Sequence, residues 1–246
     1  HAGVLVLTGY YQKENIYVKN SISYTGVGFC TYEVVVNGQV STDEINSEAF
    51  EIDLSQFQFK VGDPIEIHIK YKDDGCMPKV LNPNALAPNP TFRLHDIYVD
   101  EKGVLHWEAD NENYPLPYVI EQYKWNKWVQ IGEIMGQGGK ELHHYTFETT
   151  PVAGVNKFRI KQKGYIDKTK ISPPVAYTSL KSEISYVVNR KSGKVLFSEP
   201  TAYEVYNKFG DLVKKGYGSE INIRNLQKGI YYMNYGNSTV DFTIKK

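Results

Sequence analysis

Residues 65–71 read Ile65-Glu66-Ile67-His68-Ile69-Lys70-Tyr71, an unbroken alternation of apolar and polar side chains. Successive side chains of a β-strand point to opposite faces, so this stretch predicts a strand with one buried face. The same period recurs along the chain, which contains 20 tyrosines and many Val, Ile, Phe and Thr residues. Convincing amphipathic-helix patterns are missing. The sequence therefore predicts an all-β fold.

Interruptions of the alternation divide the 246 residues into three segments. In the first, residues 1–88, the dipeptide Asn37-Gly38 is a strong hairpin signal between two strand-like runs. Residues 80–90 hold three prolines and three asparagines, a composition that predicts a linker without strand or helix. Residues 89–179 and 180–246 alternate again. We expect three consecutive antiparallel β-sandwich domains of the immunoglobulin or fibronectin kind, the last with six or seven strands.

The second segment resembles the fibronectin type III-like modules of secreted proteins. The resemblance rests on alternating stretches at residues 104–109, 118–123, 128–132, 144–147 and 154–162. The last of these, Gly154-Val155-Asn156-Lys157-Phe158-Arg159-Ile160, matches a strand pattern of that family. Residues 164–168 depart from the family's turn of Asp followed by Gly, which leaves the conformation of this turn open.

Composition and charge bear on the class of partner and on the compartment of the protein. The formal net charge is zero, so charge gives no reason to expect nucleic acid as a partner. No apolar run approaches the length of a membrane span, so we expect no spanning segment. The chain starts at His1 without a Met, which predicts a mature protein whose signal peptide has been removed; a boundary chosen in the laboratory is the alternative.

The two cysteines, Cys30 and Cys76, both lie in the first segment. In an exported protein, such a pair within one small domain predicts a disulfide, with two buried free thiols as the alternative. The bond would close a loop of about 46 residues, for which the chain-entropy relation gives about 4 kcal/mol of stability.

The last segment contains several motifs in a fixed order. An alternating strand enters the turn Phe209-Gly210-Asp211-Leu212-Val213, a polar hairpin follows, then Leu226-Gln227-Lys228-Gly229-Ile230-Tyr231, and the end is Lys245-Lys246. Over residues 181–246 this string resembles the type A C-terminal sorting domain of proteins exported by the type IX secretion system of Bacteroidota. Gly210 and Gly229 are expected at turn positions with positive φ.

That resemblance implies a non-enzymatic protein exported through the periplasm, at the cell surface, associated with the outer membrane or secreted. The implied partners are the type IX translocon, its outer-membrane β-barrel shuttle protein and a surface sortase that removes the domain from most cargo. Contacts are expected at Phe209, Gly210, Leu212, Val213, Leu226, Lys228, Gly229, Tyr231, Lys245 and Lys246. The chain runs through to Lys246, so we expect that the domain is either retained as the tether of an accessory subunit or was captured before cleavage. A short linker near residues 177–181 would limit the access of a sortase and favours retention.

A search for catalytic residues finds no convincing set, so we expect no enzyme, metal site or cofactor. There is no Gly-x-Ser-x-Gly, His-Glu-x-x-His or phosphate-binding glycine loop. The adjacent His143 and His144 would face opposite sides of a strand. The alternative function is a secreted adhesive or carbohydrate-binding module, with Trp125 and Trp128 beside an Asn-Lys turn as the ligand surface. A cross-strand pair that closes the hairpin is the competing interpretation of those tryptophans.

Overall fold

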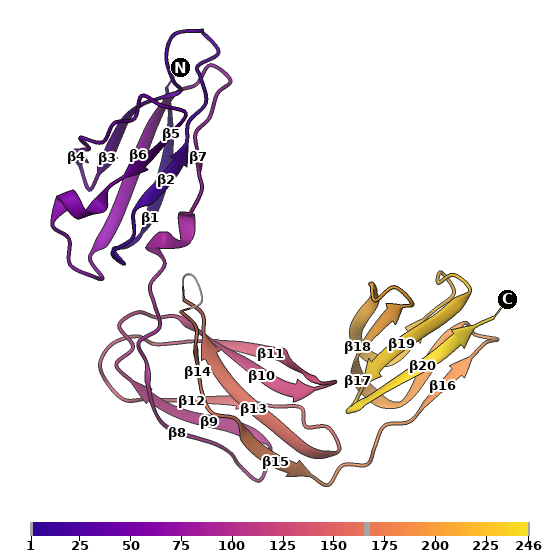
Figure 1. Ribbon diagram of the computed structural model, residues 1–246. Coiled ribbons are helices and arrows are strands. Elements are labelled where there is room, and N and C mark those ends of the chain that lie inside the picture. Colours follow the sequence, from indigo (N-terminus) through magenta and orange to yellow (C-terminus); the bar gives the residue numbers. More distant parts are fainter. Residues whose placement is uncertain (1, 165–167, 246) are drawn as a thin grey trace. The chain divides into compact units, whose positions relative to one another are not determined.

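The computed structural model describes residues 2–164 and 168–245 of the chain (Figure 1). Strands form nearly all of the regular structure there, with two short 3₁₀ helices and antiparallel pairing in the sheets. The all-β prediction is confirmed. The chain divides into two compact units, His1–Thr91 with Gln162–Lys170, and Phe92–Lys161 with Ile171–Lys246. The turn at residues 164–168 falls largely outside the described residues, as does Lys246.

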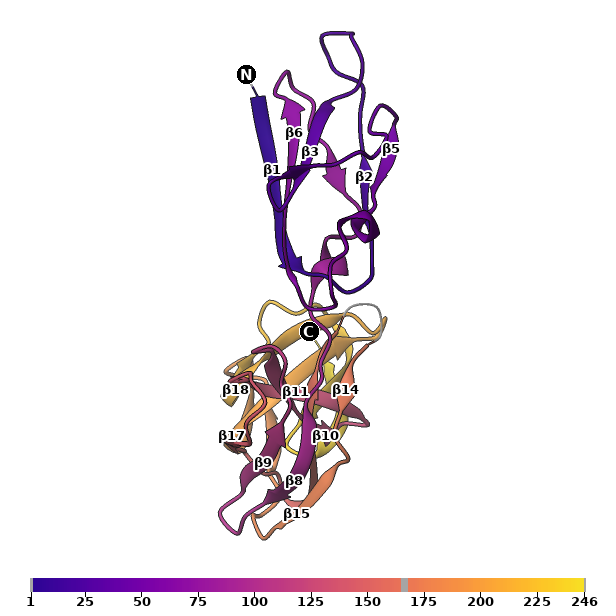
Figure 2. The same ribbon diagram turned by 90° about the vertical axis from the view of Figure 1, so that its left-hand side faces the viewer.

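The first unit is a sandwich of two sheets. One sheet has the order β1-β6-β3-β4 and the other the order β5-β2-β7. The strands of the first are Ala2–Tyr10, Pro64–Lys72, Thr31–Val36 and Gln39–Val40. Those of the second are Ala49–Ile52, Ile16–Lys19 and Lys79–Val80. Figure 2 shows β1, β6 and β3 on one side of this unit and β2 and β5 on the other.

The alternation at residues 65–71 places strand β6 at the centre of this sandwich. Ile65, Ile67 and Ile69 are buried, and β6 pairs with β1 on one side and β3 on the other. Burying a side chain of this size contributes about 1.5–3 kcal/mol. The core is completed by side chains of the second sheet such as Ile16 and Ile52, both fully buried.

Cys30 and Cys76 form a disulfide, as predicted. Both residues are buried, and the bond joins the chain just before β3 to the chain just after β6. Disulfides persist in oxidising compartments, so this bond indicates a protein that functions outside the reducing cytosol.

The predicted linker at residues 80–90 is wrong over its first half. Strand β7 extends to Val80, and Pro83–Leu86 form a 3₁₀ helix whose Ala85 and Leu86 are buried in the first core. A single 3₁₀ turn needs few backbone bonds, here from Ala85 N to the Asn82 carbonyl at 3.0 Å. Proline is well suited to its first position, because that N–H has no partner in a helix anyway.

The second unit begins with another sandwich. Its small sheet has the order β12-β9-β8, and its larger sheet has the order β11-β10-β13-β14 with β15 also paired to β13. The small sheet comprises His143–Glu148, Val104–Asp110 and Arg93–Val99. The larger comprises Lys127–Met135, Pro117–Lys124, Gly154–Gln162, Lys170–Ile171 and Val175–Ser179. The fully buried Trp107 packs among Tyr118, Tyr145 and Phe158 at its centre.

The rest of the second unit is built from five described strands, fewer than the six or seven predicted. They are β16 (Tyr186–Asn189), β17 (Lys194–Asn207), β18 (Leu212–Asn222), β19 (Gly229–Tyr235) and β20 (Ser238–Ile244). The stretches 194–197 and 203–206, which are two separate alternating runs in the sequence and count as two of the predicted strands, belong to the single long strand β17. Its pairing with β18 is interrupted between Leu196 and Thr201, around Pro200, which has no N–H to donate. One half of β17 pairs with β16 and the other with β19.

Each of the three hydrophobic cores lies within one of the predicted segments, at residues 5–86, 92–177 and 184–244. Contacts nevertheless group the second and third segments into one compact unit. Lys127 Nζ, for example, lies 2.7 Å from Glu204 Oε2, and Trp125 Nε1 donates to the Gly236 carbonyl at 3.0 Å. The boundaries at 88/89 and 179/180 stay predictions.

Candidate partner-binding surface

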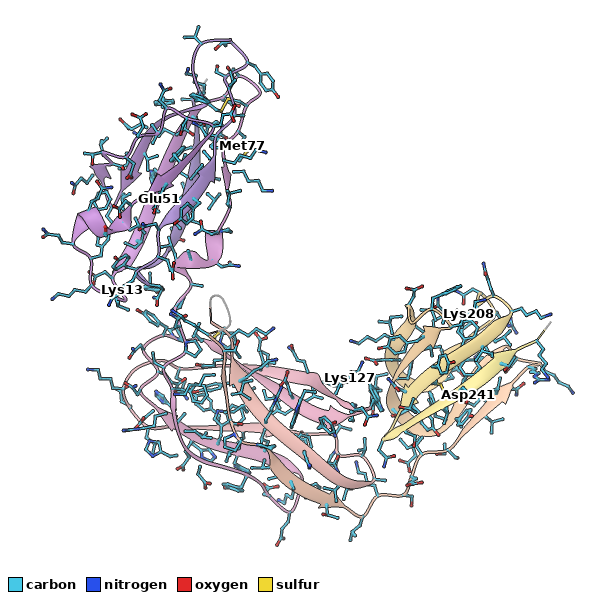
Figure 3. The ribbon with its side chains drawn as sticks, in the orientation of Figure 1. Lys13, Glu51, Met77, Lys127, Lys208 and Asp241 are labelled. Atoms are coloured by element: carbon cyan, nitrogen blue, oxygen red, sulfur yellow. A yellow bond between two sulfur atoms is a disulfide. The ribbon has the colours of Figure 1, made fainter. Side chains whose placement is uncertain are left out.

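Most of the residues that the sequence predicts to contact a partner lie at one end of the third sandwich. Asn207 at the end of β17 pairs with Tyr231, and Gly229 pairs with Ile244 near the end of β20. The turn after β17 and the end of the C-terminal strand therefore lie at the same end of this sheet. Lys208, in that turn, is labelled in Figure 3.

The turn between β17 and β18 is held by the side chain of Asn207. Its Oδ1 accepts from the backbone N–H groups of Phe209 at 2.9 Å and of Asp211 at 3.0 Å. Gly210 has φ of +85°, a conformation that costs a residue with a Cβ. These bonds fix the backbone while the Phe209 side chain points to solvent, 78% exposed. An ordered turn thus presents a largely exposed aromatic ring, and Lys208 Nζ lies 4.9 Å from the centre of this ring.

Three more apolar side chains lie on the outer face beside this turn. Leu212, Ile230 and Tyr232 are each about half exposed. Tyr206 pairs with Leu212 on one neighbouring strand and with Tyr232 on the other, so these residues form a row across β18, β17 and β19. We call Phe209, Leu212, Ile230 and Tyr232 the apolar patch. Contiguous exposed apolar groups of this kind mark interaction sites more often than isolated ones do.

A groove of about 290 Å³ opens at the same end and is lined by cations. Its charged residues are Arg190, Arg224, Lys228 and Lys245, and its apolar lining includes Val188, Ile223, Leu226 and Ile244. Within the described part of the chain, none of the four cations has an Asp or Glu at ion-pairing distance. We call this feature the basic groove. Positive charge without internal compensation favours an anionic partner.

Arg224 is the most firmly positioned of these cations. Its Nε donates to the Ser192 carbonyl at 2.9 Å, and its side chain lies against Gly193, where an added Cβ would come within 2.3 Å of Arg224 Cγ. Gly193 also has φ of +64°. The loop before β17 is therefore shaped to hold this guanidinium at the groove.

The predicted contact residues lie at the exposed turn, along the groove, or in the core beneath them. Phe209, Gly210 and Leu212 lie at the exposed turn, and Leu226, Lys228 and Lys245 line the groove. Tyr231 is buried in the third core with its hydroxyl donating to the Gln227 carbonyl at 2.8 Å, and Val213 packs against the same core. Gly229 has φ of +154° at the start of β19. Tyr231 and Val213 therefore pack in or against the core beneath this surface.

The sequence did not single out Arg190, Arg224, Ile230 or Tyr232 as contact residues. Arg190 and Arg224 are far apart in the chain and meet only when the sandwich closes. Ile230 and Tyr232 could have been found, because they share one face of an alternating strand whose other face, with Tyr231 and Met233, is buried.

The two tryptophans of the β10–β11 hairpin have partners within the protein. Trp125 and Asn126 form the turn, with φ of +57° and +59°, one residue earlier than the predicted Asn-Lys turn. Lys124 Nζ lies 4.4 Å from the centre of the Trp125 ring. Trp128 contacts the Tyr123 ring edge to face and lies 4.1 Å from the Arg159 guanidinium carbon. Internal packing thus accounts for both indoles.

Within the described residues, no helix has the length and apolar character needed to span a membrane. The same residues contain no group of three or more His, Cys, Asp and Glu side chains placed to hold a metal ion.

Comparisons with solved structures find fibronectin and adhesin domains at low similarity. No family model and no curated protein sequence matches it. The chicken CNTN1 FN1–FN3 domains are 12% identical, with 98% of each chain covered and a TM-score of 0.24. A tetra-tandem repeat in the extending region of a large adhesion protein is 7% identical, covering 99% of this chain and 75% of that one, with a TM-score of 0.27. The BSP domain of a biofilm-associated protein is 7% identical, covering 98% and 63%, with a TM-score of 0.26. At such scores, the fold assignment rests on the strand order and cores described above.

Proposed function

We propose that this chain is a non-enzymatic exported protein whose third sandwich is a type IX sorting domain. In this proposal the domain binds the outer-membrane β-barrel shuttle protein and the translocon through the apolar patch and the basic groove. The observation that carries the proposal is the gathering of Phe209, Leu226, Lys228 and Lys245 at one end of one sandwich. Those residues come from separate motifs of the sorting-domain resemblance, and a docking surface requires that they be close together.

The physical character of this end supports recognition by a folded partner. The apolar patch supplies area that is favourable to remove from water, and the groove supplies positive charge for specificity and orientation. Strand β20 pairs only with β19 in the described sheet, so its free edge is available for strand addition. The disulfide agrees with export to an oxidising compartment.

The test follows the full chain in a Bacteroidota host that has a working type IX system and in the same host without its translocon. Surface-exposed protein is measured by protease accessibility on intact cells. The chain lacking residues 180–246 and the double variant Arg224→Glu with Lys228→Glu are compared with the wild type. Lys214→Glu with Lys215→Glu makes the same change of charge away from the groove.

We expect the wild type and the Lys214/Lys215 variant to reach the surface only when the translocon is present. The truncated chain and the groove variant should stay inside the cell. Surface delivery of the truncated chain would show that the sorting proposal is wrong. Normal delivery of the groove variant would instead remove the groove from the docking surface and leave the rest of the proposal standing.

A direct measurement can test whether the sorting domain is retained as a tether. Residues 180–185, between β15 and β16, contain Leu180, whose side chain is 99% exposed. The segment is thus more accessible than the sequence argument assumed. Peptide mapping of surface-bound protein decides the matter: chains that run to Lys245 support an accessory subunit retained by its sorting domain. Chains that all end near Lys181 support cleavage.

A specific feature of the first sandwich favours an adhesive role as the second candidate function. Around the disulfide, Ile22, Tyr24, Val27 and Met77 are all more than half exposed. Figure 3 labels Met77 beside the yellow disulfide bond. This apolar end of the first sandwich is the remaining feature that fits the adhesive alternative.

Ile22, Tyr24 and Val27 lie on one loop, which is ordered by one carboxylate. Asp74 accepts from the Ser23 hydroxyl and from the Thr25 N–H at 3.0 Å, and the Ser23 hydrogen bond lowers the pKa of Asp74 to about 2. The ionised form therefore holds the loop at neutral pH. We expect Tyr24→Ser with Val27→Ser to reduce retention of the purified chain on polysaccharide-coated surfaces, with the exposed Val155→Ser as control. Equal retention of all three proteins would exclude the loop as an adhesive surface.

A further inference from the structure

Two histidines meet on the outer face of the β12-β9-β8 sheet. His106 of β9 pairs with Thr146 and His144 of β12 pairs with Glu108, so the two histidines are diagonal neighbours across the strands. His106 Nδ1 and His144 Nε2 lie 3.2 Å apart. The side chain of His144 is 46% exposed and that of His106 is 17% exposed. A small ion can therefore reach the facing nitrogens from solvent.

The other ring nitrogen of each histidine faces a carboxylate. Asp100 Oδ2 lies 2.8 Å from His106 Nε2, and Glu108 Oε1 lies 3.5 Å from His144 Nδ1. Asp100 is itself held in place, because its Oδ1 accepts from the backbone N–H groups of Lys102 at 2.9 Å and Val104 at 3.0 Å. The Tyr98 ring stacks on His106 with ring centres 4.8 Å apart. His106 is thus fixed on two sides.

One of the two tautomers follows from these contacts. A carboxylate accepts hydrogen bonds, so the contact of Asp100 with His106 Nε2 at 2.8 Å places the N–H on Nε2 and leaves His106 Nδ1 as a lone-pair acceptor. His144 Nε2, 3.2 Å away, either donates its N–H to this acceptor or, with the proton on Nδ1 toward Glu108, presents a second lone pair. In the second tautomer the two lone pairs face a common point that a metal ion can occupy.

The separation of these nitrogens suits a metal ion. With metal–nitrogen bonds of about 2.0–2.1 Å, a separation of 3.2 Å corresponds to a bond angle at the metal of roughly 100–106°, close to tetrahedral. Metal-ligating histidines commonly donate their second N–H to a carboxylate, which fixes the tautomer and raises the basicity of the ligand. Asp100 is placed for that role beside His106, and Glu108 is the nearest carboxylate to His144 Nδ1.

We propose that His106 and His144 form a two-histidine binding site for a divalent transition metal of the zinc or copper class. Imidazole is a good ligand for both ions, and copper binds the same nitrogen site more tightly. The described residues supply no third ligand in a cluster, so water or a group from a second molecule completes the coordination. The site is therefore open and reversible.

The experiment titrates ZnCl₂, and separately CuCl₂, into the full-length untagged chain by isothermal calorimetry. We expect one equivalent to bind the wild type, and His106→Gln or His144→Gln to weaken binding at least tenfold. His68→Gln is the matched control, because His68 is a half-exposed strand histidine beside Glu66 in the first unit. Asp100→Asn should weaken binding by about tenfold through loss of ligand orientation.

Histidine ring resonances of the wild type provide a readout that does not depend on variant folding. Zinc should shift the signals of His106 and His144 at substoichiometric amounts and leave those of His68 unchanged. Absence of saturable binding by the wild type would show that the two rings share only a proton. Undiminished binding by both His106→Gln and His144→Gln would place the metal elsewhere. Either result overturns the proposal.

Discussion

Removal of one hydroxyl from the core of the second sandwich should measurably destabilise the second unit. The Tyr145 hydroxyl donates to Glu112 Oε2 at 2.7 Å and accepts from the Gln137 N–H at 2.9 Å. Glu112 is fully buried, so its carboxyl group cannot turn to water for a replacement donor. Tyr145→Phe removes both bonds but keeps the ring, which stacks on Trp107 at a centre distance of 5.3 Å. The perturbation is therefore confined to hydrogen bonding.

The expected cost is the sum of two parts. A hydrogen bond between neutral groups contributes about 0.5–1.5 kcal/mol, and one to a buried carboxylate about 1.5–3 kcal/mol. Tyr145→Phe should thus lower the free energy of unfolding by about 2–4.5 kcal/mol. A double-mutant cycle tests the assignment, because Glu112→Met removes the buried acceptor. In Tyr145→Phe with Glu112→Met, the total loss should be smaller than the sum of the single losses by at least about 1 kcal/mol.

Urea unfolding followed by tryptophan fluorescence isolates this effect. The three tryptophans are Trp107, Trp125 and Trp128, all in the second unit, so the first unit contributes no tryptophan signal. Tyr123→Phe, which removes a partly exposed hydroxyl from the same sandwich, should change stability by less than about 0.5 kcal/mol. If Tyr145→Phe costs no more than this control, the buried pair does not hold the core together and the reasoning is refuted.

Three further predictions follow from other contacts. The Arg93 hydrogen bond holds the pKa of Asp110 at about 2, so stability from this pair should be complete above pH 4 and lost towards pH 2, as circular dichroism against pH can show. Lys127→Met leaves Glu204 buried without its cation and should cost the second unit about 1–2 kcal/mol in urea, a discounted figure because Lys127 is half exposed. Reduction of Cys30–Cys76 should destabilise the first unit by about 4 kcal/mol in calorimetry and leave the fluorescence transition unchanged.

The strands were predictable because their signal is local. Residues 65–71 and 104–109 alternate, and the structure places them in β6 and β9 with the apolar members buried. The prediction of a linker failed at the 3₁₀ turn Pro83–Leu86, because so short an element leaves little pattern in the sequence. Its two buried residues lie among prolines and asparagines. The strand prediction also failed for β17, because a long strand whose two halves pair with different neighbours and whose pairing with β18 is interrupted looks like two strands when read along the sequence.

The candidate sites were also only partly predictable from the sequence, for a different reason. The turn at Phe209 and Gly210 is a contiguous string, so sequence alone found it. Arg224 joins Arg190 at the groove, and His106 joins His144 on the sheet, only through strand pairing and sandwich closure. Alternation along the strand correctly predicted that His143 and His144 face opposite sides. It relates only neighbours along one strand. The decisive neighbour of His144 lies diagonally on the next strand.

The basic groove and the apolar patch at the end of the third sandwich should respond differently to salt. The salt dependence of partner binding can therefore separate their roles. Exposed cations such as Lys228 and Lys245 act over a screening length of about 8 Å at physiological ionic strength, and this length shrinks to about 3 Å at 1 M salt. The hydrophobic contribution of Phe209 and Leu212 is not weakened by such screening. A partner held by both should lose association rate at high salt but keep a residual affinity that Phe209→Ser abolishes. Binding that disappears entirely at 1 M salt would mean that the groove acts alone, and binding without any salt dependence would mean that only the apolar patch is used.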